Sequence, residues 1–277
     1  MNVNCKKAAA ACGCFLSSVF DWGVFLVFTE IDGLKIHYID EGEGSPVLLV
    51  HGWGSSILPW KPIMAGFFGH RTVALDLPGC GESDILKTDW GIEDYCEFIL
   101  KFMKAVNLQN PIMVGHSHGG RIILNMACEK MISPPKIVLF DSAGIPAKKT
   151  LKKRAKVFIY KSVKKFLMLP IFKGKNEELL KKAQSHFGSA DYRSAPEVMR
   201  KTMVRVINTD IREKLSAINC PTLLIWGEND ADTPLSDAKY LEQHIKDCGL
   251  CVIEGAGHFS FLQDPQKTVA ILKSFLN

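Results

Sequence analysis

The sequence predicts an α/β fold in which a mostly parallel sheet of eight strands carries helices on both faces. Two observations support this prediction. Eight short runs rich in apolar and β-branched residues recur along the chain, and most of them end in a turn that contains Gly, Pro or Asp. Helical-period segments separate several of these runs, and strands that alternate with helices form parallel sheets covered on both faces. At 277 residues, the chain is long enough for one large domain with an insertion.

The expected strands follow one another from residue 25 to residue 258. They are FLVFTEI, LKIHYID, PVLLVHG, TVALDLPG, PIMVGHS, KIVLFDSAG, TLLIWGEND and CVIEGAGH. Apolar residues at helical spacing predict a helix over residues 92–108 and another directly after PIMVGHS. A third helix is expected over residues 265–276, at the end of the chain.

The strand rhythm breaks between the sixth and seventh runs. Residues 145–215 contain helical patterns and no convincing strand, and about seventy residues are too many for a simple connection. We therefore expect a core formed by residues 25–144 and 216–277, with residues 145–215 as a helical cap over the C-terminal edge of the sheet. Thirteen Lys or Arg stand against two acidic residues between Ala147 and Lys182, so the cap is basic.

Residues 148–167 of the cap have one apolar helical face and a lysine-rich remainder. This pattern is typical of a cap helix that covers an active site, and it also suits weak contact with an anionic membrane surface. We favour the first interpretation. Apolar residues of the insertion, Phe166, Met168 and Phe172 among them, and Phe259 near the C-terminus are then expected to contact the substrate.

Residues 1–24 are expected to be an accessory N-terminal extension. They are apolar, but Asp21 makes them a marginal membrane span and no clear cleavage site follows them. A membrane anchor stays open as an alternative. The net charge of +5 is modest and the basic residues are concentrated in one segment, so we do not expect a nucleic-acid partner.

The nine cysteines are odd in number and irregular in spacing, which indicates reduced thiols and a cytoplasmic protein. Cys248 and Cys251 have the C-x-x-C spacing, with His244 and His258 nearby. No second C-x-x-C pair exists, so a zinc site is disfavoured. We expect neither a metal nor an organic cofactor.

Three expected strand ends carry the parts of a nucleophilic catalyst. Ser117 follows the fifth strand, Asp230 the seventh and His258 the eighth. A serine hydroxyl is a weak nucleophile until a base takes its proton, which is the role assigned to His258, while Asp230 orients the imidazole. The oxyanion of such a reaction needs donors, and we assign the backbone N–H groups of Trp53, in HGWG at 51–54, and His118.

These motifs resemble those of the α/β-hydrolase superfamily, in its serine-hydrolase branch of small esterases and lipases. The matching segments are HGWG, DLPGCGES, GHSHGG, CPTLLIWGENDADTP and GAGHF, in the expected order. Aspartate-nucleophile branches of the family are excluded by Ser117. Carbon–carbon bond hydrolases usually have Asn before the nucleophile, where this chain has His116, which lowers that alternative.

Other polar residues near these motifs are expected to support the site or to offer an alternative acid. Asp141, after the sixth strand, and Asp232 are alternative acids, whereas Glu228 lies too early on its turn. His116 and His118 are expected to pack or to line the pocket, and His51 to stabilise its turn. Asp76 and Ser83 are expected to brace a loop near the oxyanion hole.

The resemblance implies hydrolysis of a small ester with an apolar acyl part, through an acyl-enzyme on Ser117. Thioesterase, aminopeptidase and carbon–carbon hydrolase activities are alternatives within the same fold. Outside catalysis, the chain could be a ligand-binding receptor with residual activity. A membrane-peripheral lipase that uses the basic helix is a further alternative.

Overall fold

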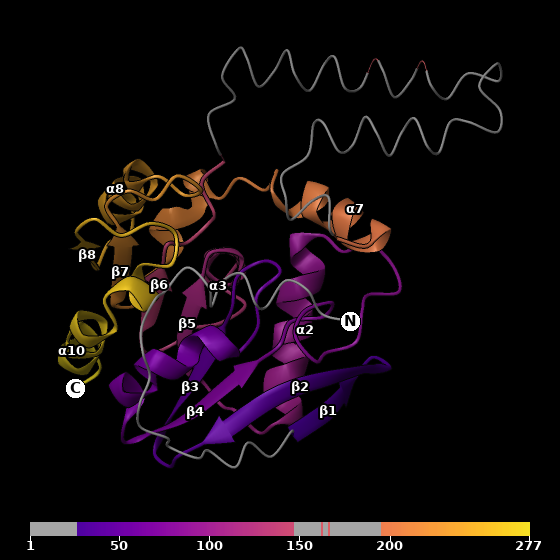
Figure 1. Ribbon diagram of the computed structural model, residues 1–277, viewed down its shortest axis with the longest axis horizontal. Helices are drawn as coiled ribbons and strands as arrows, with labels where there is room; N and C mark the ends of the chain where they lie inside the picture. Colours follow the sequence, from indigo (N-terminus) through magenta and orange to yellow (C-terminus); the bar gives the residue numbers. More distant parts are fainter. Residues whose placement is uncertain (1–26, 147–161, 163–165, 167–194) are drawn as a thin grey trace.

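The computed structural model describes residues 27–146, 162, 166 and 195–277 (Figure 1). The N-terminal extension, Met168, Phe172 and nearly all of the basic helix expected over residues 148–167 lie outside the described residues. Within the part of the chain that is described, no helix is long and apolar enough to cross a membrane.

The eight apolar runs form one sheet of eight strands. The strands are β1 (Val27–Ile31), β2 (Leu34–Glu41), β3 (Ser45–Val50), β4 (His70–Leu75), β5 (Ile112–His116), β6 (Ile137–Phe140), β7 (Thr222–Gly227) and β8 (Cys248–Ile253). Their order across the sheet is β1-β2-β4-β3-β5-β6-β7-β8. β2 is antiparallel to β1 and to β4, and every other neighbouring pair is parallel. The predicted mostly parallel sheet is confirmed.

Helices cover both faces of this sheet (Figure 1). One face packs against α2 (Ile92–Ala105), α3 (His118–Cys128), η3 (Arg212–Ala217) and α8 (Leu235–His244), and α7 (Glu197–Val206) joins the same apolar cluster through Met199 and Val206. The other face packs against η1 (Leu58–Phe67), α9 (Ser260–Gln263) and α10 (Pro265–Leu276). Strands whose side chains alternate between two covered faces are buried on both sides, which explains why the central parallel strands β5, β6 and β7 lack an alternation of polar and apolar residues.

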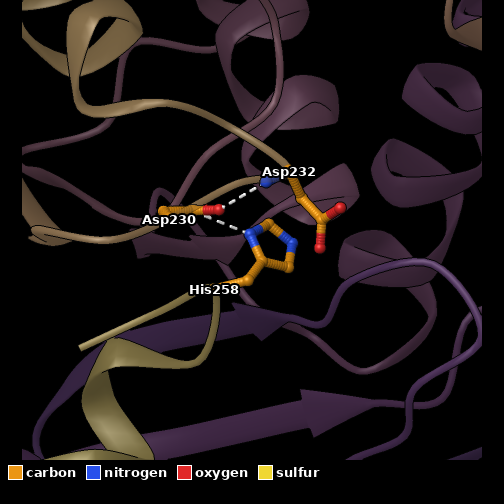
Figure 2. Close-up of side chains that lie close together, drawn as sticks. All are labelled: Asp230, Asp232 and His258. Carbon is orange, nitrogen blue, oxygen red and sulfur yellow. Dashed lines mark hydrogen bonds and ion pairs between the residues drawn. The ribbon is translucent and has the colours of Figure 1, made fainter.

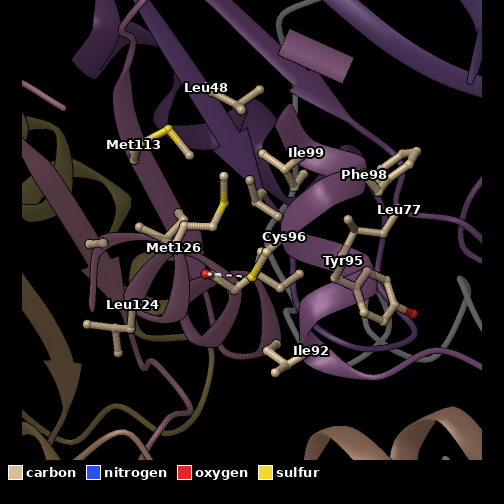
Figure 3. Packing of buried hydrophobic residues seen from close by; sticks show 14 of the residues in the cluster. Leu48, Leu77, Ile92, Tyr95, Cys96, Phe98, Ile99, Met113, Leu124 and Met126 are labelled. Carbon is tan, nitrogen blue, oxygen red and sulfur yellow. Dashed lines mark hydrogen bonds between the residues drawn. The ribbon is translucent and has the colours of Figure 1, made fainter. Parts of the chain in front are cut away.

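The central strand β3 shows this division. Leu48 and Val50 point to the α2 and α3 side, whereas Val47 and Leu49 point to the η1 and α10 side, and all four are fully buried. Figure 3 shows Leu48 and Met113 of the sheet in the same cluster as residues of α2 and α3. Full burial of each such side chain contributes about 1.5–3 kcal/mol, so the packed layers hold the strand ends in place.

Local signals start two of the covering helices. The Asp264 carboxylate accepts from the Lys267 N–H over 3.0 Å and Pro265 opens α10, a typical N-terminal arrangement. At α2, the Asp94 side chain accepts from the Gly91 N–H over 2.6 Å. A carboxylate at a helix N-terminus also interacts favourably with the helix dipole.

The described part of the expected cap, residues 195–215, contains α7 and most of η3, joined by a short turn, and it contacts the core. Thr202 of α7 accepts from the Trp90 N–H over 2.9 Å, and Arg205 donates to the Asp89 carbonyl over 2.8 Å. The expected boundary at residue 215 falls inside η3, where Leu215 is fully buried in the cluster that contains α3. The end of η3 is therefore continuous with the core.

Candidate active site

Ser117 lies in the turn between β5 and α3, at the C-terminal edge of the sheet. Its φ of 49° is in the left-handed region, where a non-glycine residue pays roughly 1–3 kcal/mol. Hydrogen bonds hold this backbone at both its N–H and its carbonyl. The Ser117 N–H donates to the Phe140 carbonyl over 3.0 Å, and the Ser117 carbonyl accepts from Ala143 over 3.0 Å. The carbonyl also accepts from the Arg121 N–H over 3.1 Å. Contacts with neighbouring segments therefore hold Ser117 in a backbone conformation that serine does not favour by itself.

Two glycines leave the space that this turn requires. A β-carbon at Gly115 would lie 2.6 Å from the backbone nitrogen of Gly120, and one at Gly119 would overlap the Val50 carbonyl. Because Gly115 has no side chain, α3 can approach β5 this closely, and because Gly119 has none, α3 can approach the end of β3 at Val50. The spacing G-x-S-x-G therefore has a steric cause in this structure.

The structure brings together the three residues assigned as a triad. His258 Nε2 lies 2.9 Å from Ser117 Oγ, and His258 Nδ1 lies 2.9 Å from Asp230 Oδ2. A carboxylate only accepts, so Nδ1 carries the proton and donates to Asp230, which leaves Nε2 to accept from the serine hydroxyl. The arrangement can move the Ser117 proton to His258.

Hydrogen bonds hold the Asp230 carboxylate in place. Oδ1 accepts from the N–H groups of Asp232 and Thr233, over 2.8 and 3.0 Å, and Oδ2 accepts from the Thr233 hydroxyl over 2.7 Å. Burial alone would raise the pKa of Asp230, but the bonds from His258 and Thr233 outweigh it and lower the pKa below its usual range. Asp230 is therefore ionised wherever the histidine can act as a base.

The charge of Asp230 also acts on His258. Burial lowers the pKa of the imidazole, but the hydrogen bond and the charge of Asp230 raise it more, so the net pKa lies above the ordinary value. A raised pKa makes His258 a stronger base toward Ser117. The side chain keeps 16% of its surface exposed, so a substrate can reach it.

The HGWG turn lies directly beside Ser117. A β-carbon at Gly52 would lie 3.1 Å from the β-carbon of Ser117, and Trp53 follows next. Among the described residues, no acceptor takes the backbone N–H of Trp53 or of His118. Both groups are thus available as hydrogen-bond donors next to the serine, as an oxyanion hole requires.

Asp141, one of the two alternative acids, and the disfavoured Glu228 occupy other places. The Asp141 carboxylate accepts from Gly227 and Ser260 and does not contact the His258 ring. Glu228 is exposed and accepts from the Gly255 N–H over 2.9 Å. Asp230 is therefore the carboxylate that bonds directly to the imidazole.

Asp232 contributes a second carboxylate near His258 (Figure 2). Asp230, Asp232 and His258 each place one possible ligand atom within 4.8 Å of the others. Every oxygen of Asp230 already accepts hydrogen bonds, so a cation would compete with the bonds that hold the acid. Within the described part of the chain, Cys248 and Cys251 belong to no such group.

Of the residues expected to support the site, His51 and Asp76 are buried and Ser83 is partly buried. His51 donates from Nδ1 to the Gly52 carbonyl over 2.7 Å and accepts at Nε2 from the Leu77 N–H over 2.9 Å, so it stabilises its turn. Asp76 accepts from the Ile57 N–H over 2.8 Å and, through its backbone carbonyl, from the Ser83 hydroxyl over 2.7 Å. The loops after β3 and β4 are joined by these bonds.

Arg121 is a buried cation that the sequence reasoning missed. It lies one turn after His118 on α3, and its guanidinium donates to the Val206 carbonyl at the C-terminus of α7. Burial lowers the pKa of Arg121 to about 10 and holds that of His118 well below its usual value. Among the described residues, Arg121 Nε and His118 Nε2 have no hydrogen-bond partner. The i, i+3 spacing of His118 and Arg121 after Ser117 is the sequence feature that places both side chains on one face of α3.

The expected substrate contacts are placed only in part. Phe259 is half-buried, with its ring centroid 4.7 Å from that of His116 and 5.7 Å from that of His258. Phe166 is 56% exposed. Met168 and Phe172 lie outside the described residues. Phe259 is thus an apolar side chain that the structure places beside His258.

The fold and the site together define a hydrolase of the α/β class. A family model described as the alpha/beta hydrolase family matches residues 47–271, which is most of the chain. The chain therefore belongs to the alpha/beta hydrolase family.

Curated relatives and solved structures agree with this assignment. The chain is 25% identical over 248 residues to 3-oxoadipate enol-lactonase 1 of Acinetobacter baylyi, covering 86% of this chain and 91% of the relative. It is 25% identical over 255 residues to 2-hydroxy-6-oxo-6-phenylhexa-2,4-dienoate hydrolase of Comamonas testosteroni, covering 83% and 87%. An esterase from Exiguobacterium antarcticum has a TM-score of 0.69 at 22% identity, over 91% of this chain and 99% of that one, which supports the fold.

Proposed function

We propose that this protein is a serine hydrolase that cleaves carboxylic esters through an acyl-enzyme on Ser117. The observation that carries the proposal is the pair of 2.9 Å contacts that His258 makes, one with Ser117 Oγ and one with Asp230 Oδ2. The similarity to an enol-lactonase supports an ester, because a lactone is a cyclic ester.

In the first half of the reaction, Ser117 Oγ attacks the ester carbonyl carbon while its proton passes to His258 Nε2. The carbonyl oxygen becomes an oxyanion, which the N–H groups of Trp53 and His118 stabilise. The carbon–oxygen bond to the alcohol then breaks, and His258 returns its proton to the leaving oxygen. The product of this half is an acyl ester on Ser117.

In the second half, water replaces the alcohol. His258 takes a proton from the water as its oxygen attacks the acyl carbon, and the same donors stabilise the second oxyanion. The bond to Ser117 Oγ breaks and His258 gives the proton back to the serine. Asp230 holds the imidazole in one tautomer throughout and stabilises it when it is charged.

An apolar acyl group is the substrate portion that we propose. Phe259 provides apolar surface beside His258, and Phe166 is exposed in the segment expected to form the cap. Burying an acyl chain against such surface contributes about 0.8 kcal/mol for each CH₂ group. Activity should therefore depend on acyl chain length.

A carbon–carbon bond hydrolase is the second candidate, supported by the similarity to the Comamonas testosteroni dienoate hydrolase. Both candidates need the same serine and histidine, so the site geometry alone does not separate them. The two candidates differ in the bond that is cleaved, a carbon–oxygen bond in one and a carbon–carbon bond in the other.

The test is hydrolysis of p-nitrophenyl esters with acyl chains from C2 to C16 by the full-length protein, by Ser117→Ala and by Ser236→Ala. Ser236 is an exposed serine at the start of α8 and serves as the matched control. We expect the wild type and Ser236→Ala to be equally active and Ser117→Ala to be inactive. Mass spectrometry of a rapidly quenched reaction should show the acyl group on Ser117.

Absence of ester hydrolysis by the wild type over the whole series would overturn the esterase proposal. Turnover of a 2-hydroxy-6-keto-dienoate under the same conditions would then establish the carbon–carbon candidate. Ester hydrolysis that persists in Ser117→Ala would exclude this serine as the nucleophile.

A further inference from the structure

Asp141 joins the two chain segments that carry Asp230 and His258. It directly follows β6 and is fully buried, with a φ of 44°. Its Oδ1 accepts from the Gly227 N–H over 2.7 Å, and its Oδ2 accepts from the Ser260 N–H over 3.0 Å and from the Ser260 hydroxyl over 2.6 Å. One side chain thus binds the end of β7 and the start of α9.

These two attachment points lie next to the triad. Gly227 opens the turn that carries Asp230, since its carbonyl accepts from the Asp230 N–H over 3.3 Å. Ser260 comes two residues after His258. A displacement of either attachment point would move the acid or the base, and the hydrogen bonds between them depend on distances that vary by only a few tenths of an ångström.

A third contact comes from the backbone of Asp141. Its carbonyl lies 3.0 Å from the Thr233 hydroxyl, which also lies 2.7 Å from Asp230 Oδ2. The same hydroxyl is 3.3 Å from His258 Nδ1. Asp141 therefore contacts the surroundings of the Asp230–His258 pair from the side of β6 without touching the imidazole.

The burial of this carboxylate has a cost that needs a reason. A buried carboxylate is unfavourable unless hydrogen bonds or a cation compensate it, and no Lys or Arg among the described residues pairs with Asp141. Burial raises the pKa of Asp141 to about 7, and the bonds from Ser260 and Gly227 act in the opposite direction. An apolar residue of similar size would avoid this cost but would leave three donors without an acceptor.

We propose that Asp141 is a positioning residue, whose carboxylate holds Asp230 and His258 at their hydrogen-bonding distance. This inference rests on the serine chemistry proposed above. Asp141 takes no proton from the substrate or from Ser117. Its effect passes through the backbone at Gly227 and Ser260.

An alkyl fluorophosphonate tests the inference without knowledge of the natural substrate. Ser117 Oγ attacks phosphorus, fluoride leaves, and the serine proton passes to His258, so the second-order labelling rate reports the alignment of the triad. We would compare the wild type with Asp141→Asn, Ser260→Ala and Thr268→Val. Thr268 is a fully buried threonine of α10 whose hydroxyl bonds to the Asp264 carbonyl, and it is the matched control.

We expect Asp141→Asn to label about 10- to 100-fold more slowly, because its amide group places N–H donors against one of the present donors. Ser260→Ala keeps the backbone donor and should lose less, roughly two- to fivefold. Thr268→Val should label at the wild-type rate. Thermal melts would show that each variant is folded at the assay temperature, and Ser260→Ala tests the inference if Asp141→Asn does not fold.

The downfield proton resonance of His258 Nδ1–H gives a second readout, which general destabilisation would not move. It should shift or broaden in folded Asp141→Asn and stay in place in Thr268→Val. A folded Asp141→Asn with the wild-type labelling rate and an unchanged resonance would overturn the inference and leave the proposed function standing. A wild-type protein that does not label would instead overturn the serine chemistry itself, and the inference with it.

Discussion

The side chain of His116 donates from Nε2 to the backbone carbonyl of His258 over 2.8 Å. The residue before the nucleophile thus contacts the main chain of the residue that takes the nucleophile's proton. Burial lowers the pKa of His116 to about 3, so the ring is neutral and Nε2 carries its proton at any working pH. This bond fixes the segment around His258 from the side of β5, as Asp141 does from β6.

Replacing His116 by Leu should therefore slow catalysis. The substitution leaves the His258 carbonyl without its donor, which costs about 1–3 kcal/mol of unfolding free energy. We expect kcat to fall about 10- to 100-fold with little change in KM, because a misplaced base affects the chemical step. Steady-state kinetics on the best ester and urea unfolding of the same samples measure both effects.

His116→Gln is the matched variant, since its amide N–H can reach a similar point. It should recover most of the lost kcat. Equal losses in the Leu and Gln variants would show that the ring, and not its hydrogen bond, supports the site.

The pH dependence of kcat/KM should follow the protonation of His258. Only the neutral imidazole accepts the Ser117 proton, so activity rises with pH through the His258 pKa and is level above it. Asp230 raises that pKa. In Asp230→Asn the rising limb of the pH profile should move to lower pH. The value of kcat/KM at the plateau should fall by roughly 10⁴-fold, because the acid no longer fixes the tautomer of His258. A limb that stays in place or moves to higher pH in Asp230→Asn would contradict this assignment.

Gly119→Ala should prevent stable folding or cost more than about 3 kcal/mol. Its new β-carbon would overlap the Val50 carbonyl, and a backbone atom in a central strand has little freedom to move. Gly249→Ala is the control, because no atom lies within 4 Å of a β-carbon there and no left-handed φ is involved. It should be neutral or stabilising by about 0.5 kcal/mol. Thermal melts of the two variants provide the comparison, and similar melting temperatures would refute the steric explanation.

The strands and the triad are predictable from the sequence for definite reasons. A parallel strand that is buried on both faces is mostly apolar along its length. A run such as the one before Ser117 can therefore be recognised from its own residues, without knowing which strands pair with it. Ser117, Asp230 and His258 each follow a strand, and the C-terminal ends of parallel strands lie at the same edge of the sheet. Their positions in the sequence therefore indicate that the three side chains lie close together.

Other features depend on contacts between distant segments and leave no local pattern. η1 carries Pro62 in its interior, where a proline usually interrupts a helix, so its sequence does not predict it. β8 begins at Cys248, before the apolar run that indicates it, because Cys248 pairs with Thr222 of β7. The bonds of Asp141 to Gly227 and Ser260 join residues 86 and 119 positions apart. Only the folded chain reveals that this carboxylate links the two halves of the site.

Arg121→Met should leave the unfolding free energy unchanged or raise it by about 1–2 kcal/mol. Burial lowers the pKa of Arg121 to about 10, so the folded state disfavours its charge. This cost is fully present at neutral pH and is lost as pH rises from the folded pKa toward the unfolded one. Methionine keeps the apolar stem and removes the charge, although it also removes the bond to the Val206 carbonyl.

Arg205→Met is the control, since exposed Arg205 pairs with Asp89 at the surface and should change stability by less than about 1 kcal/mol. Urea unfolding at pH 7 measures both variants. A loss above about 3 kcal/mol in Arg121→Met alone would contradict this prediction and show that the interactions of the guanidinium outweigh the cost of burying it.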